Sequence, residues 1–234
     1  MSEQRLKTYV WSRNIRLFHW LNVTCILLLI IIGLIIFNGK TLGISVEAKV
    51  MLKEIHVLVG YMFCLNLLYR LVIGFIGKGL ERWSNALPFF KVFRDEVKNH
   101  HSQKVYQGHN PAGKLMVAAL LTCMSIQMVT GLVIAGTDIY YPPFGSYFAE
   151  SIAIDKEALE TIKPYSKENV DEEAYKEMRA FRKPFITMHV YSFYTLLLLI
   201  PLHILGVIFG ERKEKSSLVS AMIHGYKYLP GRKE

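Results

Sequence analysis

Residues 185–209, FITMHVYSFYTLLLLIPLHILGVIF, decide the fold, because this apolar run contains no acidic residue, lysine or arginine. A run of this length and composition crosses a bilayer as a helix. Within it, His189 and His203 lie 14 residues apart. That spacing is close to four helical turns, so both imidazoles leave one side of the helix, about 21 Å apart. Metal-binding side chains at membrane depth are costly and mostly functional. The run therefore predicts a transmembrane helix that carries one candidate ligand near each membrane surface.

Three further apolar stretches are long enough to cross a bilayer. Together with the first, they give spans at about 18–37, 55–76, 114–136 and 185–209. Hydrophobic residues make up 52% of the 234 residues, which argues against an ordinary soluble protein. The sequence therefore predicts a single all-α membrane domain over residues 1–234, built as a bundle of four transmembrane helices.

The charge of the connecting segments alternates along the chain. The N-terminal arm, the connection 77–111 and the tail from residue 211 are basic, whereas the connection 137–184 holds ten Asp or Glu against seven Lys or Arg. Since basic connections stay in the cytoplasm, we expect both termini to be cytoplasmic and 137–184 to lie outside. The net charge of +9 then belongs to loops that flank the membrane. We expect no nucleic-acid partner, because no soluble face is available to carry a basic patch.

Four histidines lie inside or at the ends of the predicted spans: His19, His56, His189 and His203. With this topology, His19 and His203 lie towards the cytoplasmic surface, and His56 and His189 lie towards the outer surface. Haem iron in a b-type electron carrier commonly takes two axial imidazoles, and a four-helix bundle can hold such ligands in its core. The matched depths predict two b haems, one for each pair. No Cys-x-x-Cys-His motif occurs, so the haems would be bound non-covalently.

The 14-residue spacing recurs on the first two spans. Gly33 follows His19 by 14 residues, and Arg70 follows His56 by 14 residues. Gly33 would leave room for a flat macrocycle at the outer haem, although a glycine that serves helix packing is an equal explanation. Arg70 would pair with a propionate of the inner haem, or extend to the cytoplasmic surface.

The sequence RLFHWLN at residues 16–22 resembles the opening of the bacterial cytochrome b561 and nickel–iron hydrogenase b-type cytochrome family. The other spans and the tail add to this resemblance through Gly33, His56, Gly60, GHNPAG at residues 108–113, His189, His203 and SAMIHG at residues 220–225. The similarity covers nearly the whole chain. It implies a multi-pass protein of the bacterial inner membrane, in which these histidines bind the iron of two b haems.

The resemblance also implies the function and the partners. It points to an electron-transfer subunit of an oxidoreductase complex, linking a periplasmic redox partner, such as a hydrogenase small subunit, to menaquinone or ubiquinone. We expect that partner to dock on 137–184, although an acidic loop that serves only solvation is an alternative. A quinone site beside the inner haem would be lined by His109, Asn110 and Gly113. The pair Asn110-Pro111 is equally typical of a helix N-cap followed by proline at the first helical position.

Three other functions are compatible with parts of the pattern. The partner of a di-haem protein could instead be a periplasmic multihaem c-type cytochrome, or the chain could work alone as a quinol oxidase of the b561 kind. A haem-free transporter or assembly protein is the alternative of a different class. The spans contain neither an acidic residue nor an interrupted helix, which argues against transport.

Overall fold

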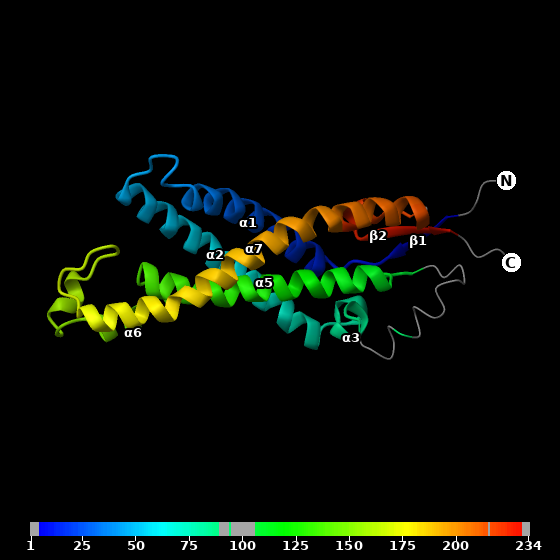
Figure 1. Cartoon of the computed structure of the whole chain (residues 1–234). Coiled ribbons are helices and arrows are strands. Elements are labelled where there is room, and N and C mark those ends of the chain that lie inside the picture. The colour runs from blue at the N-terminus through cyan, green and yellow to red at the C-terminus, as the bar shows by residue number, and fades with distance from the viewer. Residues whose placement is uncertain (1–4, 89–93, 95–105, 215, 231–234) are drawn as a thin grey trace. The chain divides into compact units, whose positions relative to one another are not determined.

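The computed structural model describes residues 5–88, 94, 106–214 and 216–230. In these residues four helices are long and apolar enough to cross a membrane. They are α1 (Arg13–Phe37), α2 (Val46–Ile76), α5 (Pro111–Asp138) and α7 (Glu172–Glu214) (Figure 1). The prediction of an all-α protein with four transmembrane helices is confirmed. Many of their large apolar side chains are exposed, as expected for helices that face lipid.

Short elements connect and extend these helices. They are β1 (Arg5–Tyr9), η1 (Gly79–Glu81), α3 (Trp83–Ala86), α6 (Gly145–Ile152), η2 (Ala158–Thr161), α8 (Leu218–His224) and β2 (Tyr226–Pro230). The described part of the chain forms two compact units, and each contains segments of all four long helices. Unit 1 comprises 1–21, 66–123 and 195–234, and unit 2 comprises 22–65 and 124–194.

Two helices begin before the predicted spans 55–76 and 185–209. The segment 46–54 belongs to α2 and is continuous with the second span. The fourth helix does not begin at Pro184 but runs through it from Glu172. The residues before Pro184 are mostly good helix formers, and Met178 is anchored in a buried cluster, which together offset the lost hydrogen bond at proline. At 43 residues, α7 is about 65 Å long and far exceeds a hydrocarbon core of about 30 Å.

The two ends of the chain pair with each other in unit 1. Strands β1 and β2 are antiparallel, with Arg5 opposite Pro230 and Tyr9 opposite Tyr226 (Figure 1). The turn between α8 and β2 places Gly225 at a φ of 88°, a conformation that favours glycine. A Cβ there would also lie 2.9 Å from the carbonyl oxygen of Trp11, so a larger residue would push the N-terminal segment away.

Unit 2 contains a small core outside the apolar windows. Ile152 at the end of α6 packs with Val170 and with Met178 of α7, and an isolated bridge pairs Ala153 with Val170. The end of α5 is fixed by charge, since Asp138 pairs with both Lys53 and Arg182. The connection that precedes α7 is therefore folded against the helix ends within this unit.

Candidate functional site

The first histidine pair lies in unit 2 and consists of His56 on α2 and His189 on α7. His56, within 22–65, and His189, within 124–194, belong to the same compact unit. A bare glycine backbone faces each ring. A Cβ built at Gly33 would lie 3.4 Å from Cε1 of His56, and one built at Gly131 would lie 3.4 Å from Cε1 of His189. At Cε1, each imidazole thus faces a glycine of a neighbouring helix, which has no side chain at that point.

The sequence reasoning missed the contribution of α5 to this pair. Thr130 places its Oγ1 2.9 Å from Nδ1 of His189, and Gln127 donates a hydrogen bond of 2.9 Å to the His189 carbonyl oxygen. Gly131 follows directly. The available signal was a run of small and polar residues, Gln127 and Thr130-Gly131, inside an otherwise apolar span. That signal did not reveal which histidine these residues face.

The second pair lies in unit 1 and consists of His19 on α1 and His203 on α7. His19, within 1–21, and His203, within 195–234, belong to the same compact unit. The members of each predicted pair thus belong to one compact unit, and their role as iron ligands stays a prediction. Because α7 carries one member of each pair, a single helix links the two sites through the chain.

Arg70 is buried, with a relative exposure of 5%, so it does not extend to the surface. Its guanidinium carbon lies 4.1 Å from the ring centroid of Trp83, and the group donates a 3.1 Å hydrogen bond to the Glu81 carbonyl oxygen. The close packing of Trp83 depends on Gly74, where a Cβ would lie 1.9 Å from the indole. These contacts occupy only some of the five N–H donors of the Arg70 guanidinium.

Asn110 is the N-cap of α5. Its Oδ1 accepts a 2.8 Å hydrogen bond from the backbone N–H of Gly113, and its Nδ2 donates one of 3.2 Å to Glu214. Glu214 also pairs with Lys227, whose side chain is 1% exposed and donates to the Tyr106 carbonyl oxygen. Asn110 therefore caps α5 through Oδ1, and its Nδ2 links α5 through Glu214 to the end of α7 and to β2.

His109 is half-buried and lies against Trp11, with ring centroids 4.8 Å apart. Burial lowers the pKa of His109 to about 4, and the positive charges of His203, Lys227, Lys114 and Arg70 lower it as well. The imidazole is thus neutral at physiological pH and offers one N–H donor and one acceptor. The surroundings of His109 are strongly cationic.

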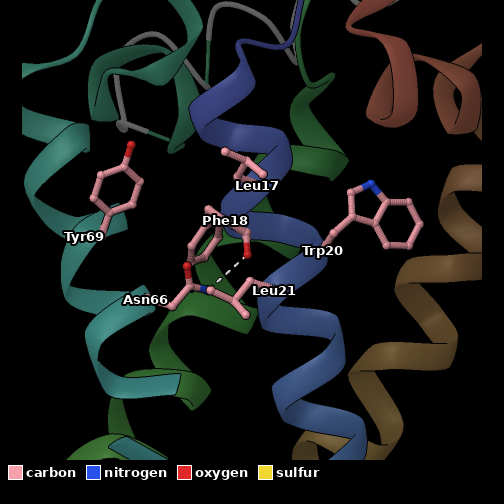
Figure 2. A pocket seen from close by; sticks show the side chains of 6 residues that line it. All are labelled: Leu17, Phe18, Trp20, Leu21, Asn66 and Tyr69. Carbon is pink, nitrogen blue, oxygen red and sulfur yellow. Dashed lines mark hydrogen bonds between the residues drawn. The ribbon is translucent and has the colours of Figure 1, made fainter. Parts of the chain in front are cut away.

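An apolar hollow of about 530 Å³ opens beside α1 in unit 1. Phe18 and Trp20, the two neighbours of His19 in sequence, contribute to its wall together with Leu17, Leu21, Asn66 and Tyr69. Figure 2 shows these side chains, with the amide of Asn66 donating a 3.0 Å hydrogen bond to the Phe18 carbonyl oxygen. The hollow is lined mainly by carbon. Its side-chain polar groups are the Asn66 amide, the Tyr69 hydroxyl and the Trp20 indole N–H, which donates to the Met222 carbonyl oxygen, and such a lining suits an amphiphilic ligand.

The residues present fit a haem at each pair. Each unit contains two histidines, and a b-type haem commonly takes two imidazole ligands, so His19 and His203 would hold one haem and His56 and His189 the other. Nδ1 of His19 and Nδ1 of His56 are buried without a hydrogen-bond partner among the described residues. Buried polar atoms rarely stay unpaired, so these rings are built for a further ligand contact. Within the described ranges, no three His, Cys, Asp or Glu side chains gather as a conventional metal-ion site.

Comparison with known proteins identifies the family. The family described as prokaryotic cytochrome b561 matches residues 10–225 of the chain. The chain belongs to this family. As a cytochrome b561, it is a multi-pass membrane protein of electron transfer with b-type haem, and the spans, half-buried histidines and bare glycine backbones described above agree with that assignment.

Two curated relatives are similar to this cytochrome. A probable Ni/Fe-hydrogenase B-type cytochrome subunit of Rhizobium leguminosarum bv. viciae is 24% identical over 99% of the chain and 93% of its own length. The probable Ni/Fe-hydrogenase 1 B-type cytochrome subunit of Escherichia coli K12 is 25% identical over 62% of the chain and 68% of its own length. No solved structure matches the chain at a significant level.

Proposed function

We propose that this cytochrome holds two b haems and passes electrons across the bacterial inner membrane between a periplasmic nickel–iron hydrogenase and the quinone pool. The observation that carries the proposal is the presence of two separate histidine pairs, one in each unit, with α7 contributing to both. When bound, the haems supply one-electron transfer. The chain holds them through His19 and His203 in unit 1 and through His56 and His189 in unit 2.

The names of the relatives support a hydrogenase as the partner. We propose that it docks on the predicted outer segment 137–184. Aromatic and aliphatic side chains with a relative exposure of 48% or more stand there: Tyr147, Ile154 and Phe181. Aromatic residues are enriched in protein interfaces, and the acidic excess of the segment gives the surface a charge that a basic partner would complement.

The proposed function is tested with the protein in liposomes that contain menaquinone or ubiquinone and with the nickel–iron hydrogenase of the source organism. Under hydrogen, each H2 gives two electrons and two protons at the hydrogenase, and we expect the haem absorbance to become reduced and the quinone to take up two electrons and two protons. If a multihaem c-type cytochrome reduced the haems and the hydrogenase did not, the c-type cytochrome would be the partner in place of the hydrogenase. Quinol oxidation without any partner would favour the free-standing oxidase.

The orientation is a separate prediction. We expect both termini and the 77–111 connection to be cytoplasmic and 137–184 to be periplasmic, because of the charge asymmetry. Reporter fusions at Ser102, which lies outside the described residues, and at Glu168 test this. We expect cytoplasmic reporter activity at the first position and periplasmic activity at the second, and the reverse pattern would contradict the model.

We propose that quinone binds in unit 1, on the side of His19 and His203. One location is the group His109, Asn110 and Gly113. The neutral N–H of His109 and the cations around it support binding of a quinone carbonyl there. The apolar hollow beside Phe18 is the other location, supported by its carbon lining and by the hydroxyl of Tyr69. Both would place the quinone near the same haem.

Two variants separate these locations. Asn110→Leu removes an amide that would bind a quinone carbonyl, and the loss of one hydrogen bond of about 0.5–1.5 kcal/mol lowers quinone affinity by roughly tenfold at most. Tyr69→Phe removes the hydroxyl of the hollow and should leave affinity unchanged if the first location is correct. Because Asn110 also caps α5, thermal unfolding is measured alongside. Weaker quinone binding in Tyr69→Phe alone would move the site to the hollow.

A further inference from the structure

Helix α5 supplies no histidine to either pair, yet it makes the only side-chain hydrogen bond to an axial histidine ring among the described residues. Thr130 is 1% exposed, and its Oγ1 lies 2.9 Å from Nδ1 of His189. A hydroxyl buried at this depth in an apolar helix must satisfy its bonding within the protein. The contact is therefore a fixed part of the His189 environment.

The single proton of the Thr130 hydroxyl decides the direction of this hydrogen bond. Oγ1 donates a 2.6 Å hydrogen bond to the Ile126 carbonyl oxygen one turn earlier, and a second carbonyl, of Gln127, lies at 3.4 Å. With its proton directed into its own helix, the oxygen has only lone pairs to offer His189. Nδ1 of His189 must therefore carry the proton and donate it. In a neutral imidazole this leaves the lone pair on Nε2, which is the nitrogen free to bind iron.

The backbone carbonyl of His189 is held by two further contacts. Gln127 donates to the His189 carbonyl oxygen from α5, and Ser192 donates to the same oxygen at 3.2 Å. Gly131 leaves the ring edge free of a side chain. The other rings differ, because Nδ1 of His19 and Nδ1 of His56 have no hydrogen-bond partner in the described part of the chain. Of these three rings, only that of His189 has a neighbour, Thr130, that fixes which ring nitrogen carries the proton.

We propose that Thr130 is a positioning residue for the haem of the His56–His189 pair. By accepting the Nδ1–H of His189 it orients the ring, fixes the tautomer and increases the basicity of Nε2, as hydrogen bonds to metal-bound histidines generally do. A more basic ligand stabilises ferric over ferrous iron. Thr130 thus lowers the midpoint potential of this haem relative to that of the His19–His203 haem. This inference rests on the proposed function, because it takes His189 as an iron ligand.

The test uses redox titrations of the purified holoprotein, followed by optical and electron paramagnetic resonance spectra. Thr130→Val keeps the shape and removes the acceptor. We expect the midpoint potential of one haem to rise by an amount on the order of 59 mV, the one-electron equivalent of a tenfold change in the ferric-to-ferrous affinity ratio. The other haem should not shift, and Thr130→Ser should restore the original potential because it restores the hydroxyl.

Thr137→Val is the matched control. Thr137 lies on the same helix and is 0% exposed, and it donates a 2.8 Å hydrogen bond to the carbonyl oxygen four residues earlier. Unlike Thr130, it makes no hydrogen bond to a histidine within the described residues. An equal shift in Thr137→Val, equal shifts of both haems, or no shift in Thr130→Val would overturn the inference. His189→Ala distinguishes these failures from a failure of the proposed function. If that variant retains two haems, His189 is not a ligand and the di-haem proposal itself is wrong.

Discussion

His56→Ala and His189→Ala each yield a protein that has lost one and the same haem, while His19→Ala and His203→Ala each lose the other. This is the result we expect, because the two members of each pair lie in the same compact unit. An iron that loses one of two axial imidazoles at membrane depth finds no replacement in the apolar surroundings. Haem content per chain, with spectra that separate the two centres, measures the effect.

The double variants sharpen this experiment. His56→Ala combined with His189→Ala should still hold one haem, whereas His56→Ala combined with His203→Ala should hold none. His224→Ala is the control, since that histidine is exposed at the end of α8. Retention of one haem when one member of each pair is missing would show that the pairing is wrong.

Asp138→Asn is expected to destabilise unit 2 by about 3–5 kcal/mol, since it leaves two largely buried cations without their carboxylate. The Asp138 side chain is 12% exposed, and its partners Lys53 and Arg182 are 20% and 12% exposed. Arg182 also donates to the Thr137 carbonyl oxygen, so the cluster joins the end of α5 to α2 and α7. Unfolding in detergent, followed by circular dichroism and by haem absorbance, measures the loss.

The control for Asp138→Asn is Glu172→Gln. Glu172 pairs with Lys167 at 3.8 Å, and both side chains are largely exposed, at 87% and 69%. Exposed pairs contribute little, so stability should not change measurably. If Asp138→Asn were as stable as Glu172→Gln, the charge cluster would not hold the helix ends. The connection 137–184 would then depend on the apolar cluster around Ile152 alone.

The four spans could be predicted from the sequence alone. Lipid is the solvent for these helices, so the length of an apolar run is enough to identify each of them. Their ends were harder to predict. The extension of α7 to Glu172 depends on Met178 packing with Ile152 and Val170, a contact between residues distant in sequence. Pro184 does not interrupt the helix, because a helix interior tolerates one missing hydrogen bond when residues on both sides are held in place.

For the candidate site, the histidine pairs were predicted from their depth in the membrane, because helical rise converts the spacing of residues in sequence into distance along the helix. Rotation about the helix axis does not follow from spacing alone, so the residues facing each ring stayed hidden. Thr130 and Gly131 approach His189 from a helix that carries no ligand. Asn110 was anticipated as a cap, but its bond to Glu214, 104 residues away, was not.

The haem-to-chain ratio of the purified wild-type protein tests the central claim most directly. Haem released from a known amount of protein is quantified as its pyridine complex, and the reduced spectrum identifies its type. The two histidine pairs predict two non-covalent b haems per chain. A ratio of one, or haem that stays covalently attached after acid–acetone extraction, would contradict the account.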